Sequence, residues 1–181
     1  MKSNIAISAR PEPDEYAPYY GKYVSLISGD DILAILKKQP PELATLLSTC
    51  TEADGDFCYA PGKWSVKEVL GHVIDTERVF SYRALRIARN DQTPMEGFEQ
   101  DDYVKYGPFS HCSLAALVEE FKSVRLATLS LFRGLDEAAW LRRGVANKNV
   151  VSVRAIAYII AGHELHHKKI LQEKYFAQAR V

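Results

Sequence analysis

Residues 113–135 read SLAALVEEFKSVRLATLSLFRGL, and core-type side chains recur along this stretch in steps of three, four, three, four, three and four residues. The recurring positions are Leu114, Leu117, Phe121, Val124, Thr128, Leu131 and Leu135. This spacing lines up one stripe on a helix and is typical of the seam of a helix bundle. The stretch therefore predicts a helix from about Ser113 to Gly134, where the glycine is suited to end it.

Two earlier segments have helical periodicity of the same kind. The segment 30–50 carries leucines and isoleucines on one face, and Pro40-Pro41 is expected to kink or split the helix. The segment 65–90 opens with the letters SVKE, which form a capping box and define where the helix begins. Both segments are long enough to span a bundle.

The segment 152–176 completes a set of four long amphipathic segments, with Ser152 as its expected cap. Strand signals are weak, so the sequence predicts an all-α four-helix bundle over residues 30–181. Residues 1–29 contain several prolines and tyrosines and are interpreted as an irregular N-terminal arm that packs its tyrosines on the bundle. The linker 91–112 is expected to form a structured loop over one end of the bundle, where it could shape a pocket.

The amino-acid composition and charge limit the classes of function to consider. The 181 residues are 47% hydrophobic and 25% charged, which fits one compact domain. Twenty-three basic residues balance twenty-three acidic ones, so the charge gives no reason to expect a nucleic acid or an anionic membrane as partner. No apolar run approaches 18 residues, which argues against a membrane span, and residues 1–10 lack the apolar centre of a secretory signal.

The cysteines favour a reduced, cytoplasmic setting. Cys50, Cys58 and Cys112 are odd in number and have no CxxC spacing, so neither a disulfide framework nor a thiolate zinc site is indicated. None of the three is interpreted as a catalytic thiol. Each is interpreted as a small, at least partly buried apolar residue.

Three of the five histidines, His163, His166 and His167, fall within five residues of the last segment. On a helix, His163 and His167 lie one turn apart, about 6 Å along the axis, at the centre of the apolar face. Imidazoles fit poorly in a dry core because each has a donor and an acceptor to satisfy, but two of them one turn apart can chelate a divalent metal. His166 lies about 80° away, so a solvated or supporting role is expected for it.

His72 is the third candidate ligand. It lies on the flank of the apolar face of the second predicted helix, beside Thr76. A lone histidine in such a place is more often simply hydrogen-bonded or exposed. Three neutral imidazoles would leave a divalent metal with open positions, which can hold water or ionise a thiol. His111, in the long linker, has no visible companion and is interpreted as an ordinary loop histidine.

Several charged side chains lie near these histidines in the sequence. Asp75, Glu77 and Glu164 could orient the imidazoles, although each could equally be an exposed helix charge, and exposure is slightly favoured for Glu164. No sequence motif identifies a general base. Glu77 or Glu164, acting through a water molecule, is the only assignment that can be suggested. Three arginines of the second helix could attract an anionic substrate, but more often such side chains form a solvated face. They are Arg83, Arg86 and Arg89.

Two stretches carry a family resemblance. Residues 63–77, KWSVKEVLGHVIDTE, and residues 162–167, GHELHH, together resemble the DinB/YfiT-like superfamily, and the resemblance extends over about residues 30–176. Its specific part is the order of one histidine on the second helix and His-x-x-x-His on the fourth. Trp64 would mark the entry to the second helix as a large apolar anchor at the end of the bundle.

The resemblance implies a four-helix bundle, often a homodimer, that holds a metal on His72, His163 and His167. Known activities in the superfamily include thiol-dependent S-transfer with bacillithiol and related thiols, maleylpyruvate isomerisation with mycothiol, and metal-dependent hydrolysis. Many of its members have no established activity.

Three hypotheses remain open at this point. The first is an enzyme in which Zn, Ni, Fe or Mn on the three histidines activates a low-molecular-weight thiol for transfer to a small-molecule substrate, or activates water for hydrolysis. The second is a non-catalytic structural or interaction protein, in which the histidines form a polar network in a dimeric bundle or hold a metal that stabilises the bundle without turnover. The third is a small-molecule-binding module that uses a pocket under the linker 91–112.

Overall fold

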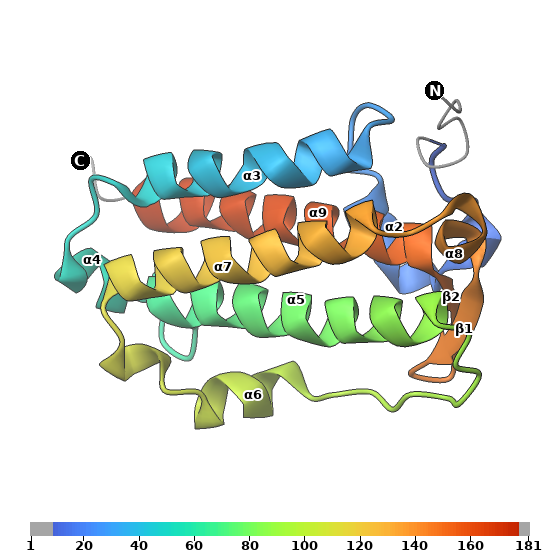
Figure 1. Cartoon of the computed structure of the whole chain (residues 1–181). Coiled ribbons are helices and arrows are strands. Elements are labelled where there is room, and N and C mark those ends of the chain that lie inside the picture. The colour runs from blue at the N-terminus through green and yellow to red at the C-terminus, as the bar shows by residue number, and fades with distance from the viewer. Residues whose placement is uncertain (1–8, 178–181) are drawn as a thin grey trace.

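Four long helices form the body of the computed structural model, which describes residues 9–177 (Figure 1). They are α3 (Ile32–Leu47), α5 (Val66–Ala88), α7 (Leu114–Arg133) and α9 (Val153–Ile170). α5 packs against α7 and α9, and α3 packs against the same two helices. The predicted all-α four-helix bundle is therefore confirmed.

The order of the helices around the bundle is not that of a simple up-and-down chain. α3 and α5 follow each other among the long helices but lie on opposite corners, each beside α7 and α9. α5 and its neighbour α7 run in the same direction (Figure 1). The chain must therefore return along the whole bundle between them, and residues 89–113 do this. The prediction that this linker covers one end was wrong for that reason.

The returning linker is structured. It contains α6 (Gln100–Tyr106) and the 3₁₀ turn η3 (Phe109–His111), and α6 lies against α5. Gly71 on α5 makes room for the linker, because a Cβ at this position would lie 2.3 Å from the ring of Phe109. The linker therefore covers a side of α5 rather than an end of the bundle.

Serine residues begin three of the long helices as predicted. Ser65, Ser113 and Ser152 each accept a hydrogen bond from the backbone N–H three residues further on. Ser65 and Glu68 form the full capping box, which satisfies two backbone donors that a helix start leaves free. α3 contains both of its prolines and still runs as one helix from Ile32 to Leu47, so the expected split is not observed.

A β-hairpin that the sequence did not predict precedes α9. Its strands, β1 (Arg143–Ala146) and β2 (Asn149–Ser152), pair antiparallel and follow the short helix α8 (Glu137–Leu141). The turn residues Asn147 and Lys148 both have positive φ, 48° and 63°, as a two-residue hairpin turn with the twist of its strands requires. These strands have four residues each, too few to produce a clear alternation.

The N-terminal arm is more regular than predicted. Its described part contains η1 (Pro13–Glu15), η2 (Pro18–Tyr20) and the short helix α2 (Gly21–Val24), and α2 lies against α9. The arm packs tyrosines on the bundle as expected: Tyr23 is buried, and Tyr20 contacts the ring of Phe80 edge-on at 5.7 Å. Residues 1–8 of the predicted arm, and the C-terminal residues 178–181 of the predicted domain, lie outside the described residues.

The end of α9 continues as a π-helical turn, η4 (Leu171–Phe176). This turn places Tyr175, whose hydroxyl donates a 2.6 Å hydrogen bond to the carbonyl oxygen of Trp64 at the entry to α5. Cys50, Cys58 and Cys112 are free thiols; Cys50 and Cys112 are partly buried as expected, but Cys58 is exposed, so its interpretation as a partly buried residue was wrong. Within residues 9–177, no helix combines the length and the apolar character that crossing a membrane requires.

Candidate metal centre

The structure brings His72 of α5 together with His163 and His167 of α9. Nε2 of His163 lies 3.0 Å from Nε2 of His72 and 3.1 Å from Nε2 of His167. One ligand nitrogen from each residue lies within 4.8 Å of the other two. His72 and His163 are buried, and His167 is partly buried. The three residues that the sequence singled out therefore form one cluster between two helices.

Burial keeps these imidazoles neutral. It lowers the pKa of His72 to about 4, with a contribution from a charge on His166. It lowers the pKa of His167 to about 3, helped by His72 and His166, and it holds the pKa of His163 well below the usual range. At neutral pH each ring therefore has a nitrogen lone pair, which is the form that binds a metal.

The donor set fits a divalent cation better than it fits hydrogen bonding. Nε2 of His163 faces two other nitrogens, yet a ring nitrogen has only one hydrogen or one lone pair to offer. It can thus make one good hydrogen bond and not two. Nitrogens that each lie about 2.1 Å from a shared ion are roughly 3.0 to 3.4 Å apart, and the two separations here agree with this range.

Neighbouring side chains position the cluster. The ring of Trp64 lies 4.8 Å from that of His72, and the ring of Tyr23 lies 5.3 Å from that of His163. Nδ1 of His72 lies 3.5 Å from the hydroxyl of Thr76, at the limit of hydrogen-bonding distance. These contacts restrict the rotation of the imidazoles and leave Nε2 of His72 pointing at the other histidines.

The remaining two histidines, His166 and His111, do not belong to the cluster, as the sequence suggested. The ring of His166 lies 5.1 Å from that of His167 and 5.3 Å from that of Tyr23, but its nitrogens are not part of the three-histidine cluster. His111 is exposed in η3. Neither residue supplies a further nitrogen to the cluster.

The carboxylates that were expected to orient the histidines form ion pairs with arginines instead. Arg125 of α7 donates to both carboxylate oxygens of Glu77, at 2.8 and 2.9 Å, and to Glu164 at 3.3 Å. Glu164 is 1% exposed, so its interpretation as an exposed charge was wrong. Burial raises its pKa to about 7 despite the arginine. Asp75 pairs with Arg78 at 3.2 Å.

Arg125 was missed because its environment comes from other helices. It follows Val124 in the α7 seam and is 1% exposed. Its guanidinium also donates to the carbonyl oxygen of Leu36 and to Oε1 of Gln39, both on α3. The guanidinium therefore joins α7 to the other three long helices, and Glu77 and Glu164 serve this ion pair rather than the imidazoles.

Two cavities adjoin the histidine cluster. One, of about 380 Å³, is lined by His72 and His163 and extends under the linker before α6. The other, of about 350 Å³, is lined by His167 and by Trp64. Asp101 of α6 lines both cavities. The linker thus shapes a pocket as expected, and it brings a carboxylate that the sequence reasoning did not single out.

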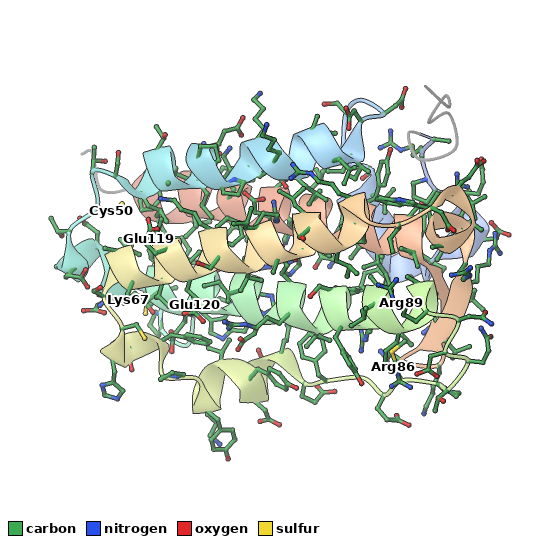
Figure 2. The ribbon with its side chains drawn as sticks, in the orientation of Figure 1. Cys50, Lys67, Arg86, Arg89, Glu119 and Glu120 are labelled. Carbon is green, nitrogen blue, oxygen red and sulfur yellow. The ribbon has the colours of Figure 1, made fainter. Side chains whose placement is uncertain are left out.

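The arginines of α5 do not line either cavity. Figure 2 shows Arg86 and Arg89 near the end of α5 that adjoins the hairpin. Arg86 pairs with Asp91 at 2.6 Å, and Arg89 is exposed. Arg83 is buried, and its guanidinium donates to the carbonyl oxygen of Glu96. Their interpretation as a site for an anionic substrate therefore has no support in the geometry.

The fold is a four-helix bundle, and three imidazoles converge beside one of its cavities. Together these features define the class of the protein as a helical bundle with a candidate metal centre. The profile of the DinB superfamily matches residues 35–171, and the chain belongs to that superfamily. No curated protein has a significantly similar sequence.

Solved structures share the fold. YfiT from Bacillus subtilis, described as a probable metal-dependent hydrolase with an unusual four-helix bundle topology, superposes with a TM-score of 0.75 at 14% identity, covering 95% of this chain and 94% of YfiT. A mycothiol-dependent maleylpyruvate isomerase superposes with a TM-score of 0.64 at 15% identity. That match covers 80% of this chain and 61% of the isomerase. At these identities the likeness shows the fold and not the reaction.

Proposed function

We propose that this protein is a metal-dependent enzyme that uses His72, His163 and His167 to hold one divalent cation, either Zn, Ni, Fe or Mn. The observation that carries the proposal is the convergence of three neutral imidazole nitrogens beside a cavity. A cation on three imidazoles supplies Lewis-acid activation of water or of a thiol. The reaction is then either hydrolysis or transfer of a low-molecular-weight thiol to a small-molecule electrophile.

Asp101 is the proton acceptor in this proposal. Glu77 and Glu164 are unsuited because both are buried and paired with Arg125. Asp101 is exposed at the start of α6 and lines both of the cavities that adjoin the histidine cluster. Its carboxylate can therefore take the proton that a water O–H or a thiol S–H releases during attack.

Metal analysis of protein purified without an affinity tag tests the proposal directly. The wild type should contain about one equivalent of metal per chain after dialysis against the candidate ions, and His163→Ala should contain almost none. His166→Ala is the matched control, because His166 lies beside the cluster without joining it, and it should retain the metal. Equal, negligible metal in the wild type and in His163→Ala would contradict the proposal.

Turnover is tested separately with simple probes. Loaded protein is assayed for hydrolysis of 4-nitrophenyl acetate and for displacement of chloride from 1-chloro-2,4-dinitrobenzene by the thiol of cysteine. Activity in one assay that is lost in His163→Ala and retained in His166→Ala identifies the reaction class. The family also leads us to propose a homodimer, which light scattering can test, and a cytoplasmic setting remains a prediction.

The alternative function is a structural or small-molecule-binding bundle without turnover. One observation favours it: separations of 3.0 and 3.1 Å between the imidazole nitrogens are also hydrogen-bond distances. In that case EDTA leaves the melting temperature unchanged, and neither assay responds to added metal. A melting temperature lowered by EDTA together with persistent inactivity would indicate a metal with a structural role.

A further inference from the structure

The N-terminal arm reaches the candidate metal centre through Tyr23 of α2. Tyr23 is 6% exposed, and its ring meets that of His163 at 5.3 Å with 84° between the two planes. Among the described residues, the ring of His163 contacts the rings of three side chains, His72, His167 and Tyr23. The first two are the other candidate ligands. Tyr23 is therefore the ring neighbour of His163 that would not itself bind the metal.

The orientation of His163 matters most because its Nε2 is the nitrogen that lies close to both of the others. A metal ligand must keep its lone pair aimed at the ion, and the neighbours of the imidazole fix this aim. The polar contacts of His163 with described side chains both involve Nε2, the atom that would hold the metal. They cannot orient the ring while a metal occupies that atom, whereas the packing of Tyr23 against the ring can.

The position of Tyr23 is set by contacts that do not involve the histidines. Before Tyr23 in the chain, Glu15 accepts a 2.6 Å hydrogen bond from the hydroxyl of Ser152, the cap of α9. At the end of α2, the guanidinium of Arg10 donates to the carbonyl oxygen of Val24 at 2.8 Å. α2 itself packs on α9 (Figure 1). The ring of Tyr23 therefore has a fixed place against which the imidazole packs.

The arm lies outside the part of the chain that the family profile matches. The match begins at residue 35, whereas α2 ends at Val24. All three histidines of the cluster lie within the matched residues. A role for Tyr23 at the centre is therefore an addition to the features by which the profile defines the superfamily.

We propose that Tyr23 is a positioning residue of the candidate metal centre, and that its contact with His163 couples docking of the arm to binding of the metal. The inference rests on the proposed function for the presence of the metal. A coupling free energy between two sites acts in both directions. The docked arm therefore raises the affinity for the metal, and the bound metal stabilises the docked arm by the same factor.

Two substitutions of Tyr23 test the effect of the arm on the metal. Tyr23→Leu removes the ring and should raise the dissociation constant for Zn²⁺ by about 10- to 100-fold, whereas Tyr23→Phe keeps the ring and should stay within about threefold of wild type. The matched control is Tyr20→Leu, because Tyr20 belongs to the same arm and packs on Phe80 rather than on a histidine. The absorption spectrum of the Co²⁺-loaded protein reports ligand geometry, and it should change in Tyr23→Leu alone.

Hydrogen exchange on the wild type tests the effect of the metal on the arm without any substitution. The amide of Leu26 donates to the carbonyl oxygen of Tyr23 at 3.0 Å, so its exchange reports opening of this part of the arm. It should exchange about 10- to 100-fold more slowly with Zn²⁺ than after chelation. The amide of Gly55, in the short helix α4 (Glu52–Asp56), also has a 3.0 Å backbone hydrogen bond and should change much less.

The orientation of His163 can also be measured without any metal. In chelated protein, ¹³C relaxation of the imidazole reports how far the ring is held in one orientation. Tyr23→Leu should lower the order of the His163 ring, and Tyr23→Phe should preserve it. His111, which is exposed in η3, gives the reference value for an exposed imidazole.

The outcomes separate this inference from the proposed function. A Zn²⁺ affinity that is equal in Tyr23→Leu and wild type, or that falls equally in Tyr20→Leu, overturns the inference and leaves the metal site in place. Exchange at Leu26 that does not respond to Zn²⁺ in metal-binding protein, or an unchanged order of the His163 ring in chelated Tyr23→Leu, also overturns it. A lowered ring order in a protein that binds no metal would support the positioning role of Tyr23 and contradict the proposed enzyme.

Discussion

Gly162 of α9 faces the carbonyl group of Tyr23 so closely that a Cβ there would lie 2.1 Å from the oxygen. The arm can approach α9 in this way only because residue 162 has no side chain. The contact lies one residue before His163, whose ring meets that of Tyr23 at 5.3 Å. The close packing of the arm and the geometry of the histidine cluster therefore depend on the same glycine.

Gly162→Ala should destabilise the protein, because the added methyl group must displace the backbone of α2. We expect the free energy of unfolding to fall by about 1 to 3 kcal/mol, measured by urea denaturation. Gly21→Ala is the control: it lies in α2 itself, where a Cβ meets nothing within 4 Å, and it should change stability by less than about 1 kcal/mol. Equal stability of Gly162→Ala and wild type would show that α2 does not hold this position in solution.

Arg125→Met should destabilise the bundle strongly, because it leaves Glu77 and Glu164 buried without their cation. We expect a loss of about 3 to 5 kcal/mol in the free energy of unfolding at pH 7. Arg133→Met on the same helix removes an exposed arginine and should stay within about 0.5 kcal/mol of wild type. A loss as small as that of the control would mean that water reaches the ion pair.

Protonation of Glu15 should make the free energy of unfolding depend on pH in the acid range. Burial opposes ionisation of its carboxyl, but hydrogen bonds from Arg154 and Ser152 outweigh this and lower its pKa from 4.5 to about 2. A lowered pKa in the folded state contributes stability above pH 4.5, and the contribution is lost as the pH falls toward 2.

Glu15→Gln should therefore cost on the order of 2 kcal/mol at pH 7, and the cost should shrink between pH 4.5 and pH 2. The measurement is the difference in unfolding free energy between variant and wild type at each pH, which cancels the titration of other groups. Asp14→Asn alters the neighbouring exposed pair with Arg143 and should show a much smaller change. A difference that does not vary with pH would contradict the assignment.

Asp101→Asn should lower kcat of the metal-loaded enzyme by about 10² to 10⁴ if its carboxylate takes the proton. The metal content should remain that of the wild type, because residue 101 is not part of the three-histidine cluster. Asp102→Asn is the control, because Asp102 is exposed and lies next to Asp101 on the same helix; this variant should keep its activity. An Asp101→Asn enzyme with normal kcat would assign the proton transfer to another group.

The sequence predicted the parts of the fold that depend on local patterns. Ser65, Ser113 and Ser152 each start a helix as expected, because a cap is a contact between residues three apart. His163 and His167 were placed together by helix geometry alone. His72 was a third candidate from its place on the flank of the second helix, and the family resemblance then implied it as a ligand. Its distance from α9 depends on how two helices pack, which the sequence does not show.

Most of the features that the sequence did not predict depend on contacts between residues that are far apart in the sequence. Arg125 and Glu164 lie far apart in the sequence, so neither position shows that the other neutralises it. Asp101 becomes a cavity residue only because α5 and α7 run in parallel and draw the linker back along the bundle. The hairpin was missed because strands of four residues leave little periodicity to detect.

Backbone hydrogen bonds join the turn end of the hairpin to Met95, whose N–H donates to Val145 and whose carbonyl accepts from Asn147. Backbone bonds place few demands on side-chain identity. The turn that lines the cavity can therefore diverge in evolution, by substitution or by a change in length, while the histidines remain fixed on α5 and α9. Such an arrangement would let the cavity change its shape without altering the candidate metal centre.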